Sequence, residues 1–286
     1  MSSVECAVSD GVATVLISNP AKRNAMTTGM WSALPPLLDR LAGDPGVQVV
    51  VLTGDGETFC AGADISTLTG LRPGVPTSAM LAEEAMVSFP KPIIAAIRGW
   101  CVGGGCQLAA VCDLRIAAVG SRFGITPAKI GVVYPAATTA RLVDLVGQAT
   151  AKFLLFTGEF IDAERALRVG LIDELVPADQ LADRVDALAR TLTTRSQLTL
   201  HAAKDLIRAI TAGEPYHDRY VRWEEAGRDE LAEGVAAFSE RRAPNFRWRP
   251  QAEQAPAGAS PVVEPPPGPA VEATAGAGTE ATAGQA

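Results

Sequence analysis

The sequence predicts a layered α/β domain that is followed by a helical section. Short apolar, β-rich runs alternate with helical segments in the N-terminal part, which is the pattern of helices packed on a sheet. Between about residues 180 and 242, in contrast, only helical patterns occur. The chain has 286 residues, 48% hydrophobic and 20% charged, which is enough to bury one large core or two smaller ones.

Each predicted element follows from its own stretch of sequence. Residues 11–19 form an apolar run that predicts a strand. Residues 26–46 predict a helix that is interrupted by a Pro-Pro pair and closed by Gly and Pro. We expect buried strands at residues 47–56 and 91–99, a helix start at 103–112 and a longer extended stretch at 113–125. We expect helical segments at residues 178–192, 196–210 and 216–242.

Composition and charge argue against several classes of function. The formal net charge is -7 and Lys and Arg form no cluster, so we expect no nucleic-acid partner. The longest apolar stretch, residues 92–112, contains an arginine and several glycines, and a buried strand, turn and helix explain it better than a membrane span. We expect no signal peptide, because the first residues lack a basic region followed by a long apolar one.

The cysteines indicate a reduced compartment and no metal. They form no CxxC pair and lack the spacing to histidine that zinc sites use. An odd number without a secretion signal predicts reduced, mostly buried thiols in a cytoplasmic protein. The five are Cys6, Cys60, Cys101, Cys106 and Cys112.

Two loops of small residues each follow a predicted strand, FCAGADI at 59–65 and the GGG run within 99–113. Glycine lets a ligand approach the backbone, and free N–H groups at a helix start can stabilise an oxyanion. Two such loops could supply two N–H groups to one carbonyl oxygen; two tight turns in a glycine-rich core are the alternative. The spacing fits neither a dinucleotide-binding fingerprint nor a P-loop.

Further motifs carry a resemblance to a known family. They are SNPAKRNAM, VVLTGDGETFCAGADI, KPIIAAIRGWCVGGGCQLAAVCDLRIAA, SRFGITPAKIGVVYP, DAERALRVGLIDELVP and AFSERRAPNF, in that order. Over about residues 4–248 the chain resembles the crotonase (enoyl-CoA hydratase/isomerase) superfamily. The resemblance implies an α/β fold of the ClpP/crotonase type, a spiral of β-β-α units with a C-terminal helical region. It also implies an acyl-CoA thioester substrate, no cofactor beyond the CoA of that substrate, and a homotrimer or dimer of trimers.

The domain boundaries follow from this resemblance and from composition. We expect residues 1–195 to form the spiral core with the CoA site and residues 196–248 to form a helical, oligomer-forming region. Residues 249–286 consist mostly of Pro, Ala, Gly and Glu without an aromatic residue. Such a segment cannot bury enough apolar surface to offset the entropy of ordering, so we expect it to be disordered.

The resemblance also assigns site residues. The backbone N–H groups of Ala63 and Gly104 would form an oxyanion hole for the thioester enolate. Residues implied in binding substrate or CoA are Lys22, Arg23, Ala25, Ala61, Ala63, Asp64, Ile65, Gly103 and Arg241. For the basic residues among them, a solvated surface position is the alternative.

The chain departs from the family pattern at both acid–base positions. Hydratases of the family use two glutamates, and their places are taken here by Gln107 and Pro127. Gln107 cannot exchange a proton near neutral pH and proline has no side-chain donor. Because general acid–base catalysis contributes typically ~10²–10⁴-fold, we expect ordinary hydration to be crippled. Glu83 and Glu84, on a predicted helix near the site, could replace a carboxylate; a solvated helix face is the alternative.

Tyr134 suggests another reaction. The segment TPAKIGVVY resembles a stretch of the methylmalonyl-CoA decarboxylases of the same superfamily, in which the tyrosine holds the substrate carboxylate. Decarboxylation needs an oxyanion hole but no general base, and a neutral Gln107 would repel a carboxylate less than a glutamate would. A buried core tyrosine is the simpler explanation. Three hypotheses therefore stay open: an altered hydratase or isomerase, a malonyl-type acyl-CoA decarboxylase, and an acyl-CoA-binding protein without catalysis.

Overall fold

A six-stranded sheet organises the described part of the chain, which comprises residues 2–67 and 74–250 of the computed structural model. The strand order is β1-β2-β3-β4-β6-β9; β1 and β2 are antiparallel and the other neighbours are parallel. A smaller sheet has the order β5-β7-β8. The strands are β1 (Ser3–Ser9), β2 (Val12–Ser18), β3 (Val49–Gly54), β4 (Ile93–Ile97), β5 (Trp100–Val102), β6 (Leu114–Ala118), β7 (Arg122–Gly124), β8 (Ile161–Asp162) and β9 (Glu174–Val176).

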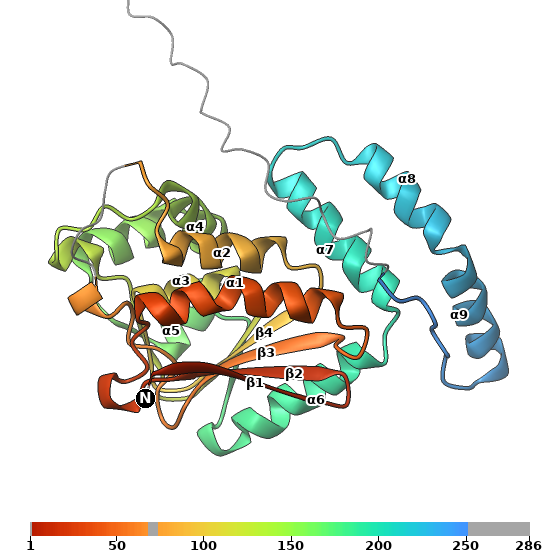
Figure 1. Ribbon diagram of the computed structural model, residues 1–286, viewed down its shortest axis with the longest axis horizontal. Coiled ribbons are helices and arrows are strands. Elements are labelled where there is room, and N and C mark those ends of the chain that lie inside the picture. The colour runs from red at the N-terminus through yellow and green to blue at the C-terminus, as the bar shows by residue number, and fades with distance from the viewer. Residues whose placement is uncertain (1, 68–73, 251–286) are drawn as a thin grey trace, which may run out of the picture. The chain divides into compact units, whose positions relative to one another are not determined.

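Helices cover both faces of the main sheet, as Figure 1 shows for α1, α2 and α3 on one side and α6 on the other. Along β3, Val50 and Leu52 pack in the core shared with α1, α2, α3 and α4, whereas Val49 and Val51 pack with α6. This alternation is expected for strands that are buried on both faces. The helices are α1 (Thr28–Gly43), α2 (Ser78–Ser88), α3 (Gly104–Val111), α4 (Ala136–Thr157), α5 (Ala163–Arg168), α6 (Leu181–Thr193), α7 (Gln197–Thr211), α8 (His217–Ala226) and α9 (Arg228–Glu240). The layered α/β fold and the strands predicted within residues 11–19, 47–56 and 91–99 are thus confirmed.

Helix α1 corrects the prediction that the Pro-Pro pair interrupts it. Pro35 and Pro36 lie inside one continuous helix, which begins at the Thr27 cap. A proline in a helix interior costs about 3 kcal/mol. The helix tolerates this cost because it buries a stripe of apolar side chains in the core: Met30, Trp31, Leu34, Leu37, Leu38 and Leu41.

Two other predicted segments each contain two elements in the structure. Residues 113–125 contain two strands, β6 and β7, separated by a turn at Gly120, whose φ is +89°. Residues 216–242 contain two helices, and Gly227 ends α8 by donating its N–H to the Trp223 carbonyl (3.0 Å). Strand β1 and the long helix α4 have no counterpart among the predicted elements, and α4 includes a kink at Gly147 (φ +72°).

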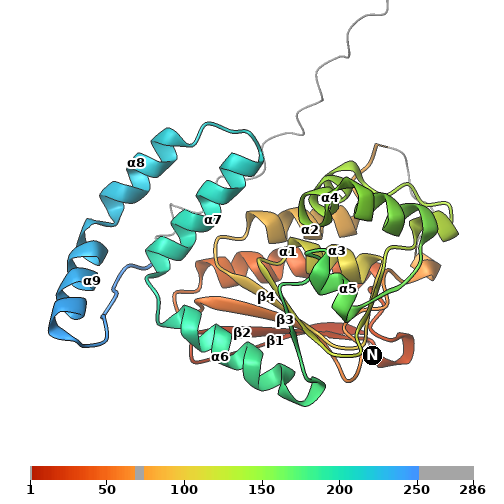
Figure 2. The ribbon, with the colours of Figure 1, turned by 180° about the vertical axis from the view of Figure 1, so that it is seen from behind.

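The C-terminal helical region, α7, α8 and α9, is confirmed and can be followed in Figure 2. The Lys204 ammonium joins α7 to the sheet by donating to the Asp113 carboxylate (2.7 Å) and the Lys91 carbonyl (2.9 Å). His201 and Trp248 make an edge-to-face contact, with ring centroids 5.0 Å apart. The expected domain boundary at residue 195 stays a prediction, and most of the tail expected to be disordered, residues 251–286, lies outside the described residues.

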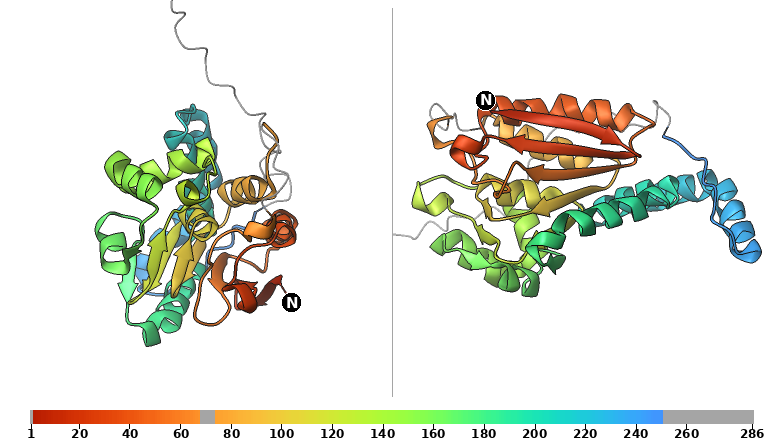
Figure 3. Two further views of the ribbon diagram at one scale, coloured as in Figure 1. Left: turned by 90° about the vertical axis from the view of Figure 1, so that its left-hand side faces the viewer. Right: turned by 90° about the horizontal axis from the view of Figure 1, so that it is seen from below.

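Two further observations bear on the sequence predictions. Cys60, Cys101, Cys106 and Cys112 are buried, as expected for most of the thiols, and Cys6 is exposed on β1. Among the described residues, none of the helices combines the length and apolar character that a bilayer span requires. Figure 3 shows the main sheet from two more directions.

Candidate active site

Two loops of small residues lie against each other after strands β3 and β5. Cys60 and Cys101 form an isolated parallel bridge. In it, the Cys60 N–H donates to the Trp100 carbonyl (2.9 Å) and the Val102 N–H donates to the Cys60 carbonyl (2.9 Å). Gly62, two residues after Cys60, has a φ of +114°, which few residues other than glycine adopt. The bridge therefore places the loop after β3 beside the start of α3.

The backbone N–H groups of Ala63 and Gly104 are unpartnered donors in this part of the described chain. Neither donates a hydrogen bond to another described residue. Gly104 is the first residue of α3, where N–H groups lack a partner within the helix and carry the positive end of its dipole. A Cβ on Gly104 would lie 3.2 Å from the Ala63 nitrogen and 3.0 Å from the Trp31 ring, so glycine permits this close approach. Two N–H groups on adjoining loops are suited to bind one oxyanion.

The segment before α1 holds the Ala63 loop in place. The Met26 N–H donates to the Gly62 carbonyl and the Asp64 N–H donates to the Met26 carbonyl, both at 2.8 Å. These two bonds make Met26 and Ala63 partners in a parallel bridge. The position of the Ala63 N–H is therefore fixed by backbone pairing on both sides.

Residues predicted to bind CoA come from the two segments that meet at this bridge: Lys22, Arg23, Ala25, Ala61, Asp64 and Ile65. The Lys22 ammonium lies 2.6 Å from an Asp64 carboxylate oxygen, and the Ser66 hydroxyl donates to the other (2.8 Å). These two donors hold the pKa of Asp64 below its usual range. Lys22 keeps 52% of its side chain exposed in this ion pair.

Asn24 supports this corner of the site, and the sequence analysis missed its role. Its Nδ2 donates to the carbonyls of Asp55 (2.9 Å) and Thr58 (2.6 Å), and its Oδ1 accepts the Asn19 N–H (3.0 Å). The residue is buried and has a φ of +59°, which asparagine tolerates better than most residues. The available signal was the Asn-Ala pair in SNPAKRNAM, which served only as part of the family resemblance.

Gln107 lies one turn into α3, and its side chain ends beside a buried carboxylate. Its backbone N–H donates to the Gly103 carbonyl (3.0 Å), and its Nε2 donates to Glu83 Oε2 (2.5 Å). Glu83 comes from α2 and is only 3% exposed. The two acids predicted near the site therefore separate: Glu83 faces Gln107, whereas Glu84 is an exposed residue of the helix surface.

Two hydroxyl groups lie near Gly103. The Tyr134 hydroxyl donates to the Gly103 carbonyl at 3.5 Å, and burial raises the pKa of this phenol well above its ordinary value. The Thr126 hydroxyl lies 3.8 Å from where a Cβ on Gly103 would be, and the sequence analysis did not single it out. Pro127 follows as a buried residue that begins a short 3-10 helix. Two hydroxyl groups thus lie near Gly103, whereas Pro127 offers no side-chain donor.

Comparisons with known proteins identify the family of the chain. The family profile described as enoyl-CoA hydratase/isomerase matches residues 7–249. The chain belongs to this family. It is 32% identical over 252 residues to the 2,3-dehydroadipyl-CoA hydratase of Escherichia coli (strain K12), covering 83% of this chain and 96% of that protein. It is 35% identical over 255 residues to the (E)-benzylidenesuccinyl-CoA hydratase of Thauera aromatica, covering 84% and 97%.

A solved structure of an enoyl-CoA hydratase/isomerase family member matches the fold with a TM-score of 0.83 and 39% sequence identity. The match covers 88% of this chain and 98% of that one. The sheet and helices described above are therefore the crotonase fold, and the predicted resemblance is confirmed. The family membership agrees with an acyl-CoA-processing enzyme.

In this member of the enoyl-CoA hydratase/isomerase family, the expected contact of Arg241 with CoA stays a prediction. Arg241 caps the end of α9 with a φ of +55°, and within the described residues its guanidinium makes no hydrogen bond or ion pair with the group around Ala63.

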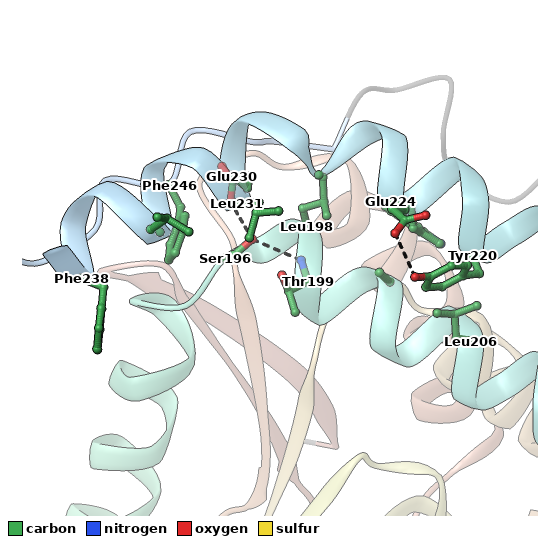
Figure 4. Close-up of a pocket in the computed structure, with 15 residues that line it drawn as sticks. Ser196, Leu198, Thr199, Leu206, Tyr220, Glu224, Glu230, Leu231, Phe238 and Phe246 are labelled. Atoms are coloured by element: carbon green, nitrogen blue, oxygen red, sulfur yellow. Dashed lines mark hydrogen bonds between the residues drawn. The ribbon is translucent and has the colours of Figure 1, made fainter.

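A separate groove of about 580 Å³ lies between α7 and the two helices that follow it (Figure 4). Its lining includes Leu198, Leu206, Trp223, Leu231, Val235, Phe238 and Phe246, and none of the predicted site residues.

Proposed function

We propose that the chain processes an acyl-CoA thioester through an enolate whose oxygen is bound by the N–H groups of Ala63 and Gly104. The two unpartnered N–H groups on adjoining loops are the observation that carries this proposal. Donors that are in place before the reaction stabilise the developing negative charge without reorganisation. The names of the two hydratase relatives, both of which specify CoA thioesters, support the same substrate class.

The side chains around this oxyanion hole support altered chemistry. Gln107 can donate and accept hydrogen bonds but exchanges no proton near neutral pH, and Pro127 has no donor. Tyr134 is a neutral phenol, because burial raises its pKa, and can donate a hydrogen bond. We propose that Gln107 and Tyr134 orient the acyl group. We also expect ordinary hydration of enoyl-CoA to be slow.

The CoA moiety would extend along residues 61–65, with Lys22 and Arg23 toward its phosphates. The half-exposed Lys22 side chain and the backbone contact between the two segments, in which the Ala61 N–H donates to the Arg23 carbonyl (3.0 Å), support this placement. Contacts of Gly103 with substrate and of Arg241 with CoA remain part of the proposal. No cofactor is needed, since CoA belongs to the substrate, and we expect a cytoplasmic location.

A decarboxylase of malonyl-type CoA thioesters is the second candidate, and the position of Tyr134 favours it. Its hydroxyl lies at the start of the helix that supplies the Gly104 N–H, where it could hold a substrate carboxylate.

The C-terminal helices support self-association as a homotrimer or dimer of trimers. On α9, Leu231 and Phe238 are 70% and 87% exposed, and they lie on the groove shown in Figure 4. Contiguous apolar surface of this kind marks an interaction site. A second copy of the chain is the partner that we propose for it.

One experiment separates the candidate reactions. The protein is incubated with crotonyl-CoA, a 3-enoyl-CoA and methylmalonyl-CoA in turn, and products are identified by mass. Slow or absent hydration of crotonyl-CoA together with turnover of another thioester is expected. Hydration at an ordinary hydratase rate would show that Gln107 and Pro127 do not limit the chemistry. Binding without any turnover would instead support a non-catalytic acyl-CoA-binding protein, and no binding at all would refute the proposed substrate class.

A further inference from the structure

Glu83 is a buried carboxylate with donors from two other helices around it. Gln107 Nε2 on α3 and the Thr138 hydroxyl on α4 both donate to Oε2, each at 2.5 Å. The Arg141 guanidinium on α4 donates to Oε1 and forms an ion pair with it. A charge that is removed from water needs such a counter-charge and full hydrogen bonding. The three donors are therefore matched to an ionised Glu83.

This arrangement determines which end of the Gln107 amide faces the carboxylate. An ionised carboxylate only accepts hydrogen bonds, so the NH₂ group must point toward Glu83 and the amide oxygen away from it. Oε1 of Gln107 accepts no hydrogen bond from a described residue. It is also absent from the fully buried polar atoms without a partner in the described chain, which are Arg98 Nε, Arg115 Nε and Gln197 Oε1. The amide oxygen of Gln107 therefore borders accessible space one turn from the start of α3.

We propose that Glu83 is a positioning residue that holds the Gln107 amide with its oxygen toward the acyl group. This role rests on the proposed acyl-CoA function of the site. It means that position 107 offers a hydrogen-bond acceptor, so the site favours an acyl group with a donor, such as a 3-hydroxyl group, over one without. It also means that positions 83 and 107 together carry one negative charge, neutralised by Arg141.

The first test measures ligand preference, using 3-hydroxybutyryl-CoA and butyryl-CoA in calorimetric titrations of the full chain. The parent protein should bind the hydroxylated thioester roughly fivefold more tightly, the effect of one hydrogen bond. Glu83→Gln should lose this preference while its affinity for butyryl-CoA stays unchanged, because two amides no longer fix which end of Gln107 faces outward. Glu84→Gln is the matched control: it removes a carboxylate from the same arginine, at 3.2 Å, but leaves Gln107 untouched.

The second test measures stability and needs no acyl-CoA. Gln107→Glu would place a second carboxylate beside Glu83, so one of the two must hold a proton with a raised pKa. The other titratable and charged groups facing the pair are Arg141, Glu84 behind it, and Tyr134, which lies within reach of the Glu83 charge. The melting temperature of Gln107→Glu should therefore fall by several degrees, relative to the parent, from about pH 5 to about pH 8. Combining Gln107→Glu with Glu83→Gln restores one charge and should remove this loss.

The outcomes are distinct. If the parent binds both thioesters equally, or if Glu83→Gln keeps the preference for the hydroxylated one, the positioning role is wrong. If the melting temperature of Gln107→Glu shows no pH-dependent loss, or if adding Glu83→Gln fails to remove that loss, positions 83 and 107 do not share a single negative charge. If the parent binds neither thioester, the proposed function fails, and the stability test still decides whether Glu83 and Gln107 share one charge.

Discussion

Replacing Gly104 by proline tests the oxyanion hole directly. Gly104 is the first residue of α3, a position where proline is well tolerated in helices and where its missing N–H breaks no helical hydrogen bond. The substitution therefore removes the proposed donor while leaving the hydrogen bonds of the helix in place. It also adds a Cβ, 3.0 Å from the Trp31 ring and 3.2 Å from the Ala63 nitrogen, so the two loops must separate by a few tenths of an ångström.

Gly104→Ala is the control for the added Cβ, since it has the same Cβ but keeps the N–H; the proline variant differs from it in the missing N–H and in the ring carbons that replace it. The loss of one oxyanion donor typically lowers kcat by about 10²–10³, or ~2.7–4 kcal/mol of transition-state stabilisation. We expect the proline variant to be slower than the alanine variant by that factor on the acyl-CoA thioester that the parent turns over. Melting temperatures verify that both variants fold. Equal rates for the two variants would refute the assignment of the Gly104 N–H.

Three other predictions concern different parts of the chain. Gln107→Glu alone should raise crotonyl-CoA hydration only weakly, measured by product mass, because position 127 still lacks a carboxylate and Glu83 opposes the new charge. Burial lowers the pKa of His201 to about 4, so the folded protein excludes a proton that the unfolded chain binds below about pH 6.5. Stability is therefore lost as pH falls from about 6.5 to about 4, and His201→Phe, which keeps the contact with Trp248, should reduce that loss by up to about 3 kcal/mol in urea unfolding. Phe238→Asp should convert the proposed oligomer to smaller species in light scattering, because a charge would replace an apolar side chain in the interface.

Each of these three has a contradicting result. Full hydratase activity of Gln107→Glu would show that another residue already supplies the second proton-transfer role. The control for His201→Phe is His217→Phe, which changes an exposed histidine and should leave the pH dependence of the free energy of unfolding as in the parent. If both variants show the same pH dependence, His201 is not the group responsible. A parent chain that is a single copy in solution would end the proposal of self-association.

The sequence predicted the loops of the site better than its side chains. The close approach at Gly104 needs residues without bulk on two separate loops, and that requirement is visible as small residues in FCAGADI and GGG. The place of Glu83 could not be predicted in the same way. Adjacent acids on a helix point in different directions, and only the packing of α2 against α3 shows that Glu83 faces Gln107 while Glu84 faces solvent.

The errors in the fold prediction have a similar cause. The helix-breaking tendency of proline predicted a break at Pro35 and Pro36. In the structure, apolar side chains of α1 on both sides of the two prolines pack in the core, and the helix is continuous. Asn24 was passed over because two of its three hydrogen-bond partners, Asp55 and Thr58, come from a chain segment that is distant in sequence. Tertiary packing decided all of these cases.

The cysteines have a practical consequence for labelling chemistry. Only thiolates react readily with alkylating reagents, and burial raises the pKa of Cys60, at the centre of the paired loops, to about 12. The same cause raises the pKa of Cys101 and Cys112. Cys6 is the exposed thiol, although partial burial raises its pKa too, so a maleimide should attach slowly and at one place. A dye on β1 could then report on ligand binding and assembly while the paired loops keep their native sequence.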